Sequence, residues 1–259
     1  LSTLWMGVIG FIDDYLKIII KAKDGMIARY KMIGQILLGV IISYSIISSN
    51  DFNGFNTKTT IPFFKNFEFD FGIFYPLLVI IVITATSNAV NLTDGLDGLA
   101  IGPIMITTLS FAFIAYFTGN LIYSEYLKIP YVSDTGELVI ICASLIGAGL
   151  GFLWFNAPPA MVFMGDTGSL SLGGVIGVTA SASRHELVLV IIGGLFVLET
   201  VSVIVQILSF KLTGKRIFRM APLHHHFEQK GWAESTIVIR FWIIAVILAL
   251  VGISSLKLR

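Results

Sequence analysis

Residues 100–118 read AIGPIMITTLSFAFIAYFT and carry no charged side chain. A helix needs about 20 mostly apolar residues to cross the roughly 30 Å hydrocarbon core of a bilayer. The stretch therefore predicts a transmembrane helix. The whole composition agrees, because 56% of the 259 residues are hydrophobic and only 13% are charged, against about 25% charged in soluble domains. These values exclude a soluble globular protein.

Other apolar runs extend this pattern in both directions along the chain. They predict an all-α polytopic membrane protein that forms a single domain over residues 1–259, a helical bundle with about seven complete spans and one partial span. The run SLSLGGVIGVTASAS is short and rich in Gly and Ser, which suits either a re-entrant segment or close helix packing. The chain begins inside an apolar run, and we expect N-terminal spans to be missing. Besides residues 100–118, the predicted spans are 1–12 (the end of a span), 32–47, 71–87, 137–155, 169–183, 187–210 and 236–256.

The basic residues indicate the orientation of these spans. If the spans alternate, eleven of the 17 Lys and Arg residues lie on one face, Lys17, Lys31 and Lys211 among them. An excess of Lys and Arg marks cytoplasmic loops, so this face is predicted to be cytoplasmic. The count requires residues 169–183 to cross the membrane, which favours a span there. On the opposite face, Asn-Gly at 53–54 and the alternating apolar residues around Pro62 predict a small extracytoplasmic hairpin within 48–70.

Four short polar segments on the predicted cytoplasmic face contain six of the 16 Asp and Glu residues. Ionisable residues at membrane depth are costly and commonly mark function. Because the topology places all four segments on one face, we expect them to form a shared site. The segments are FIDDYLK (11–17), NAVNLTDGLDG (88–98), NAPPAMVFMGDTG (156–168) and APLHHHFE (221–228).

Three aspartates in these segments are candidate metal ligands. Asp13 and Asp14 are adjacent, and a divalent cation or Lys17 removes the repulsion between them. A solvated helix end with an Asp13–Lys17 ion pair is the alternative. Asp166 stands between two glycines ahead of a span, where a carboxylate beside space for phosphates suits Mg²⁺. A helix N-cap is the alternative role for Asp166.

Asn91, Asp94 and Asp97 recur every third residue. On a helix they share one face, whereas Gly95 and Gly98 favour a tight turn whose amides can approach a phosphate or a sugar. A polar turn between two spans is the alternative without a function. The three aligned oxygen-bearing side chains favour a ligand site.

Three of the four histidines are consecutive: His224, His225 and His226. Consecutive residues on a helix point in different directions, so phosphate binding or acid–base chemistry is favoured over a zinc site. The run is internal, which excludes a terminal affinity tag. The nearby basic run from Lys211 to Arg219 favours a diphosphate or an anionic lipid, or serves only as a topology signal. Glu199 is expected to be paired inside the bundle or to mark a helix break.

Together, these segments resemble those of the phospho-N-acetylmuramoyl-pentapeptide transferases, a branch of the polyprenyl-phosphate N-acetylhexosamine-1-phosphate transferase superfamily. The resemblance runs over the whole chain. The uninterrupted APLHHHFE is more typical of the muramoyl-pentapeptide branch than of the superfamily. The matching strings are FIDDYLK, NAVNLTDGLDGLA, GLGFLWFN, FMGDTGSL and APLHHHFE.

The resemblance implies an Mg²⁺-dependent enzyme of peptidoglycan synthesis in the bacterial inner membrane, with its active site facing the cytoplasm. The expected donor is UDP-MurNAc-pentapeptide, the expected acceptor is undecaprenyl phosphate, and the products are lipid I and UMP. The family fold is a bundle of ten transmembrane helices, usually dimeric, so about two helices and part of a third are expected to be absent here. Membrane lipids and a second copy are the other expected partners, and no nucleic acid is expected.

The resemblance also implies roles for single residues. Asp166 would be the principal Mg²⁺ ligand, and Asp13 and Asp14 would lie near the phosphates, with Asp13 as the base. Direct displacement by the acceptor phosphate is favoured over a phosphoenzyme formed on Asp13 or Asp14. The residues expected to contact substrate are Asn91, Asp94 and Asp97 on the nucleoside side, Phe163 stacked on uracil, Asn156, and the histidines His224, His225 (also a catalytic candidate) and His226.

Three other functions compete with this hypothesis. A non-catalytic lipid-binding membrane protein would show no nucleotide turnover. A sister transferase would use a UDP-GlcNAc-type donor, and donor competition separates the two. A transporter would bury its acids near the middle of the membrane in corresponding halves, whereas here the acids gather at one face.

Overall fold

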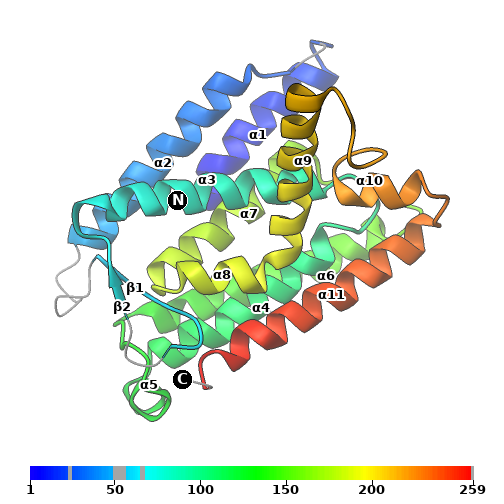
Figure 1. The fold of residues 1–259 in the computed structure, drawn as a ribbon. Coiled ribbons are helices and arrows are strands. Elements are labelled where there is room, and N and C mark those ends of the chain that lie inside the picture. The colour runs from blue at the N-terminus through cyan, green and yellow to red at the C-terminus, as the bar shows by residue number, and fades with distance from the viewer. Residues whose placement is uncertain (23–24, 49–56, 65–67, 258–259) are drawn as a thin grey trace.

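The computed structural model describes residues 1–22, 25–48, 57–64 and 68–257. The described chain is almost entirely helical, which confirms the predicted all-α class (Figure 1). The long helices are α1 (Ser2–Ile18), α2 (Ala28–Ser48), α3 (Tyr75–Thr93), α4 (Ile101–Thr118), α6 (Leu138–Asn156), α7 (Gly165–Ala182), α9 (Gly194–Thr213) and α11 (Glu234–Ser254). The short elements are α5 (Leu121–Leu127), α8 (Glu186–Ile192), α10 (Leu223–Glu228), the 3₁₀ turns Gly72–Phe74 and Thr135–Glu137, and the strands β1 (Lys58–Thr60) and β2 (Glu68–Asp70).

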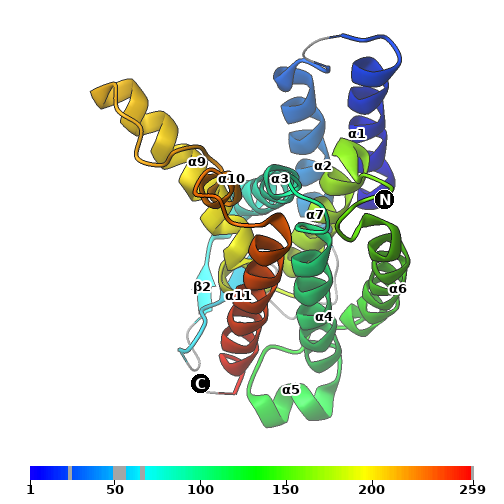
Figure 2. The ribbon, with the colours of Figure 1, turned by 90° about the vertical axis from the view of Figure 1, so that its right-hand side faces the viewer.

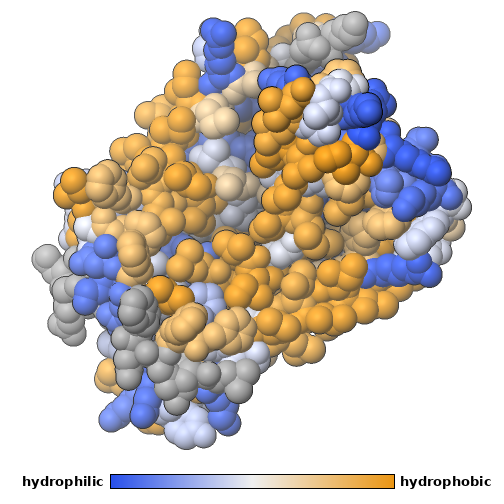
Figure 3. Space-filling view, in the orientation of Figure 1, coloured by the Kyte–Doolittle hydropathy of each residue, from blue (hydrophilic) through white to orange (hydrophobic). Residues whose placement is uncertain are grey.

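Six helices of the described chain are long and apolar enough to cross a membrane, which confirms the polytopic prediction. The surface agrees with a membrane location. Apolar residues cover the middle of the molecule in Figure 3. Hydrophilic residues gather around α10 and the α9–α10 connection at one end, and around the β-hairpin and α5 at the other. The six helical segments are Ala28–Ser48, Gly72–Thr93, Ile101–Thr118, Thr135–Asn156, Gly194–Thr213 and Glu234–Ser254.

Helix α7 lies inside the bundle and packs along both α1 and α3. It contains the predicted span 169–183 as one continuous helix, so that run does not form a re-entrant loop. Its glycines allow the close packing: a Cβ atom on Gly173 would lie 2.7 Å from the Cα atom of Ser87, and one on Gly177 would lie 3.0 Å from the Cα atom of Ile83. Small residues at such contacts let helix backbones approach each other. The same Gly and Ser content makes α7 less apolar than the six candidate spans.

The predicted single span 187–210 is wrong. The structure divides it into α8 and α9, and the chain changes direction at Gly193 (Figure 1). Glycine is a weak helix former, and two glycines stand together here, Gly193 and Gly194. A Cβ atom on Gly193 would lie 2.9 Å from the Leu189 carbonyl oxygen, so the bend is tight. Beyond it, α9 leans away from the rest of the bundle in Figure 2.

Strands β1 and β2 pair antiparallel within the segment for which a hairpin was predicted, with Thr59 opposite Phe69. The hairpin is tied to the bundle through a buried carboxylate. Glu186 at the start of α8 accepts hydrogen bonds from the Thr59 hydroxyl (2.6 Å) and the Tyr75 hydroxyl (2.7 Å). The Asn-Gly pair at 53–54 lies outside the described residues.

Candidate active site

Two helices bring three carboxylates together. Asp13 and Asp14 lie near the end of α1, and Asp166 lies in the first turn of α7. One oxygen from each can be chosen so that all three lie within 4.8 Å of one another. Asp13 is fully buried, and the side chain of Asp166 is 14% exposed. The arrangement can hold a metal ion, because hard cations prefer several carboxylate oxygens at short range.

Close packing of α1 on α7 creates this cluster. A Cβ atom on Gly10 would lie only 2.2 Å from the Asp166 carbonyl oxygen, so only glycine lets the two backbones approach this far. Gly165, which begins α7, has a φ of +63°, a left-handed conformation that glycine adopts without strain. The two glycines thus fix the position of Asp166 against α1.

Asp14 caps α7 from the neighbouring helix. Its carboxylate accepts hydrogen bonds from the backbone N–H groups of Asp166 (3.1 Å) and Thr167 (2.9 Å), and from the Thr167 hydroxyl (2.6 Å). The first N–H groups of a helix have no partner within the helix, so these contacts satisfy two of them. The alternative role of Asp166 as an N-cap is therefore excluded.

Two lysines neutralise the cluster. Lys17 forms the predicted ion pair with Asp13 and lies 3.5 Å from Asp166. Lys31, from the first turn of α2, bridges Asp13 (3.0 Å) and Asp166 (2.6 Å). Burial acts to raise the pKa of Asp13, but hydrogen bonds from both lysines and from the backbone N–H of Met26 hold that pKa below its ordinary value. Burial acts to lower the pKa of Lys17, yet Asp13 and Asp166 raise it.

The end of α3 adds an amide and a fourth carboxylate. The Asn91 side-chain N–H donates to Asp166 (3.0 Å) and to the Ser169 hydroxyl (2.8 Å). Asp94 follows the last helical residue, and burial together with the charges of Asp166 and Asp14 raises its pKa to about 6. The helix ends before Asp94, so the turn interpretation of Asn91–Asp94–Asp97 is correct and the shared helical face is wrong.

Asp97 and Asn156 hold a loop beside this turn. Asp97 accepts from the backbone N–H of Ala160 (2.8 Å), and Asn156 accepts from the N–H of Gly98 (3.1 Å) while donating to the Val162 carbonyl (2.8 Å). The loop ends at Phe163, whose side chain is 75% exposed. The exposed ring is free to stack on a planar ligand.

The three histidines of α10 point to three different partners, as the consecutive spacing predicts. His224 is fully buried against Glu199, His225 contacts Glu228 through Nδ1 at 2.8 Å, and His226 accepts the backbone N–H of Arg219 at 3.0 Å. Burial, followed by the charges of Lys230 and Arg219, lowers the pKa of His226. Of the three, His224 contacts the turn at Gly95, and no described contact pairs a histidine with the three clustered carboxylates.

The sequence analysis assigned no role in the site to three residues that make polar contacts in this region. Lys31 was counted only among the basic residues that indicate the cytoplasmic face. Glu199 was not assigned to chemistry, and Glu234, which accepts from the backbone N–H of Asp97 (3.1 Å), was not considered. Each comes from a helix far away in sequence from the residue that it contacts. For Lys31 the only signal in the sequence was its position as a basic residue at the predicted cytoplasmic end of a helix.

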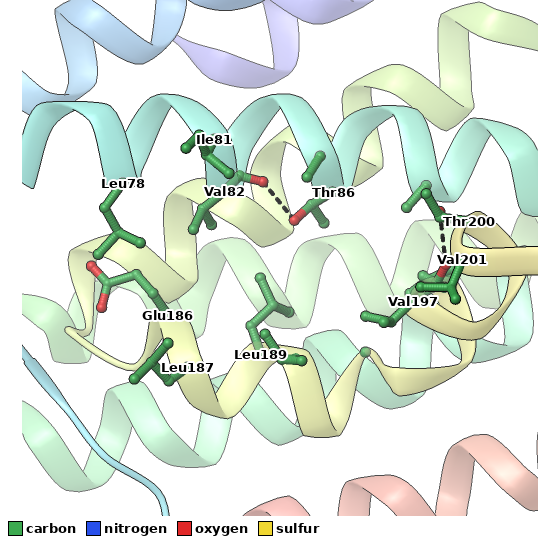
Figure 4. A pocket seen from close by; sticks show the side chains of 15 residues that line it. Leu78, Ile81, Val82, Thr86, Glu186, Leu187, Leu189, Val197, Thr200 and Val201 are labelled. Carbon is green, nitrogen blue, oxygen red and sulfur yellow. Dashed lines mark hydrogen bonds between the residues drawn. The ribbon is translucent and has the colours of Figure 1, made fainter. Parts of the chain in front are cut away.

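An apolar cavity of about 300 Å³ lies between α3, α8 and α9 (Figure 4). Leu78 and Val82 on α3 line it from one side, and Leu189 and Val197 line it from the other. Ala89 also lines it and stands two residues before Asn91, which contacts Asp166. The cavity therefore extends along α3 toward the end of the helix that carries Asn91.

Comparisons with known proteins identify the family of the chain. The family described as "Glycosyl transferase family 4" matches residues 1–184. A phospho-N-acetylmuramoyl-pentapeptide-transferase from Pelagibacter ubique (strain HTCC1062) is 57% identical over 256 residues, covering 98% of this chain and 70% of the relative. The protein of the same name from Maricaulis maris (strain MCS10) is 56% identical over 261 residues, covering 99% and 71%. The chain therefore belongs to the phospho-N-acetylmuramoyl-pentapeptide-transferase family within the family 4 glycosyl transferases.

Proposed function

We propose that the protein transfers phospho-MurNAc-pentapeptide from UDP-MurNAc-pentapeptide to undecaprenyl phosphate, with lipid I and UMP as products. The observation that carries this proposal is the cluster of Asp13, Asp14 and Asp166 with Lys17 and Lys31, together with an apolar cavity along α3, the helix that also brings Asn91 to Asp166. The cluster combines cationic groups for phosphates with carboxylates for a metal, and the cavity offers an apolar surface. A reaction that joins a nucleotide donor to a lipid phosphate needs all three.

Mg²⁺ is the metal that we propose for the three carboxylates. The donor set fits, because the ligands are hard oxygens and Mg²⁺ is usually held by one or two carboxylates plus substrate phosphates. Asp166 is the proposed principal ligand, with Asp13 and Asp14 beside it. When bound, Mg²⁺ would offset the negative charge of two phosphates that must approach each other.

The lysines suit a role at the diphosphate of the donor. Lys17 and Lys31 both reach Asp13 and Asp166, and their side chains are 40% and 20% exposed. Each ammonium group can therefore turn from a carboxylate to a phosphate oxygen without leaving the site. Such fixed cations stabilise the charge that develops in phosphoryl transfer.

Asp13 is better suited to hold charge than to accept a proton. A general base works best when its pKa lies near the working pH, whereas the pKa of Asp13 is lowered. The second pKa of a phosphate monoester is about 6, so the acceptor is largely deprotonated at neutral pH without a base. We propose that Asp13 anchors Lys17 and Lys31, in place of the base role that the resemblance implies.

Direct displacement is the proposed route. An oxygen of the acceptor phosphate attacks the β-phosphorus of the donor, a new P–O bond forms, and the bond to the α-phosphate oxygen breaks. UMP leaves with that electron pair. Both oxygens of the Asp14 carboxylate accept hydrogen bonds at the start of α7, which disfavours it as a nucleophile. Isolation of a phosphorylated protein after incubation with donor alone would contradict this route.

The nucleoside end of the donor is assigned to the neighbouring turn and loop. Phe163 offers an exposed ring for uracil, and the Asp94–Asp97 turn lies between the carboxylate cluster and α10. Asp97 and Asn156 shape this region through the loop that they hold. His225 is partly exposed, with its side chain 26% accessible, and is proposed to contact substrate.

The apolar cavity between α3, α8 and α9 is proposed to hold the prenyl chain of the acceptor. Its walls are mostly apolar, and it reaches Ala89 near the end of α3 that carries Asn91. We propose that the phosphate of a prenyl chain bound there extends past the end of α3 toward Lys17 and Lys31. We further propose that the site faces the cytoplasm of the bacterial inner membrane and that the protein forms a homodimer.

The test follows UMP release by full-length protein in detergent or lipid, with and without Mg²⁺, for the wild type and Asp166→Ala. We expect release to require donor, polyprenyl phosphate and metal, and to be lost in the variant. Release with UDP-GlcNAc but not with UDP-MurNAc-pentapeptide would assign the protein to the sister branch. No release with either donor from a folded sample would refute the transferase assignment.

A further inference from the structure

Glu199 is a buried carboxylate that the proposed reaction does not use. It lies on α9, within a candidate membrane span, and is fully buried. A charged or polar group in such a place is costly unless it is paired, and it commonly marks function. Its partner is His224, which is also fully buried.

Glu199 ties α9 to the start of α10. One carboxylate oxygen accepts the backbone N–H of His224 (3.3 Å), and the other lies 3.2 Å from Nδ1 of the same residue. Pro222, which precedes α10, provides no side-chain cap for the helix. Because the first N–H groups of a helix lack partners within it, the carboxylate from α9 supplies an acceptor that α10 itself does not provide.

The opposite edge of the His224 ring contacts the turn at Gly95. A Cβ atom on Gly95 would lie 2.2 Å from Nε2 and 3.0 Å from Cε1 of His224, so the ring fills the space that this glycine leaves open. Gly95 lies between Asp94 and Asp97. A continuous set of contacts thus runs from Glu199 through His224 to the turn that carries both aspartates.

The same contacts control the next histidine. The ring centroids of His224 and His225 are 4.2 Å apart. The Nδ1 atom of His225 lies 2.8 Å from the Glu228 carboxylate within α10. A displacement of His224 would therefore move both the Asp94–Asp97 turn and His225.

We propose that Glu199 is a positioning residue for donor binding, acting through His224 on the Asp94–Asp97 turn. This inference rests on the proposed function, in which that turn faces the nucleoside of the donor. Glu199 touches no substrate. Its carboxylate holds the backbone of His224 and lies beside the ring that contacts the turn.

The experiment measures the donor KM, the acceptor KM and kcat for the wild type, Glu199→Ala, Glu199→Gln and Gly95→Ala. Glu199→Ala should raise the donor KM roughly tenfold, which corresponds to a loss of about 1.4 kcal/mol of donor binding, and should leave the acceptor KM unchanged. Glu199→Gln keeps a side-chain carbonyl oxygen that can accept the backbone N–H of His224. This variant should retain most of the affinity for the donor. Ser202→Ala is the matched control, because the buried Ser202 hydroxyl on α9 donates to the backbone carbonyl of Glu199 and not to its carboxylate.

A double variant tests whether the effect passes through His224. Gly95→Ala displaces the same ring from its other side, so it should raise the donor KM in the same way. Residues that act through one shared contact give non-additive effects, and the double variant should be no worse than the more impaired single variant.

Three outcomes would overturn the inference. One is an unchanged donor KM in Glu199→Ala with only a lower melting temperature. Another is a double variant whose KM increase is the product of the two single increases. An inactive wild type would refute the proposed function together with this inference, whereas an active wild type with either of the first two results would refute the inference alone. If Glu199→Ala does not fold, Gly95→Ala displaces the same ring, and an unchanged donor KM in that variant would overturn the inference.

Discussion

Replacing Gly10 with alanine tests whether helix packing sets the geometry of the carboxylate cluster. The added Cβ atom would lie 2.2 Å from the Asp166 carbonyl oxygen and 2.6 Å from the Thr167 Cα atom. Both are backbone atoms, so no side-chain rotation relieves the overlap. Relief to an ordinary contact requires α1 to move about 1 Å away from α7, which carries Asp13 and Asp14 away from Asp166.

The expected loss follows from that displacement. Misplacement of a catalytic group by about 1 Å can lower the rate about 100-fold, and overpacking in a well-packed interior costs about 1–3 kcal/mol. Gly10→Ala should therefore fold with a lower melting temperature, release UMP roughly 100-fold more slowly, and need more Mg²⁺ for half-maximal rate. The assay is UMP release over a Mg²⁺ titration, with the melting temperature measured on the same samples.

Gly7→Ala is the matched control on the same helix. Its Cβ atom would meet only the Ser171 hydroxyl, at 3.0 Å, and that oxygen can rotate away. We expect the control to keep nearly full activity. Wild-type rate and wild-type Mg²⁺ dependence in Gly10→Ala would refute the argument that this backbone contact positions Asp166.

Four further predictions concern single residues. Asp14→Ala removes the acceptor for two N–H groups at the start of α7, so it should lower stability by about 1–2 kcal/mol in a denaturation assay and abolish UMP release. Phe163→Ala should raise the donor KM without changing the melting temperature, because the ring is exposed; an unchanged KM would argue against stacking on uracil. In metal-free protein, the folded-state pKa of Asp94 is raised to about 6, so stability should fall as pH rises from about 4 to 6, and Asp94→Asn should remove that slope in thermal unfolding. Ala89→Trp narrows the apolar cavity and should raise the acceptor KM while the donor KM stays constant, which steady-state kinetics would reveal.

The membrane helices could be predicted because their signal is local. A long apolar stretch such as residues 100–118 has few alternatives in lipid, where every backbone group must be hydrogen-bonded within the helix. The prediction of a single span failed at residues 187–210, because the segments before and after the bend are equally apolar and the hydropathy does not reveal it. Only the adjacent Gly193 and Gly194 indicated it, and glycine also occurs within unbroken helices such as α7.

The Gly- and Ser-rich composition of α7 suited both a re-entrant segment and a closely packed helix. Its glycines allow close packing against Ser87 and Ile83. This packing can be predicted only when the neighbouring helix is known. The neighbouring helix is distant in the sequence, so the local pattern of residues does not identify it. The hydropathy of the segment is therefore low because its surroundings are protein rather than lipid.

The candidate site could be located but not assembled from the sequence. The aspartates were visible as costly groups on one predicted face, whereas the backbone N–H groups that Asp14 caps follow from the contact of α1 with α7. The pairing of Glu199 with some partner was expected, and its identity as His224 depends on how α9 and α10 meet. Propensities describe neighbours in sequence, and these contacts join residues 25 to 153 positions apart.

The charges of the cluster explain why the two lysines belong to it. Asp13, Asp14 and Asp166 together carry three negative charges, and Lys17 and Lys31 return two positive ones, which leaves one net negative charge at neutral pH. Removing one partner of a buried pair typically destabilises a protein by about 3–5 kcal/mol, because the remaining charge has no compensation. A divalent cation would reverse the net charge of the site to one positive, and the lysines would then be free to turn toward an arriving diphosphate. The same two side chains can thus stabilise the empty site and bind the donor, without a change in the surrounding helices.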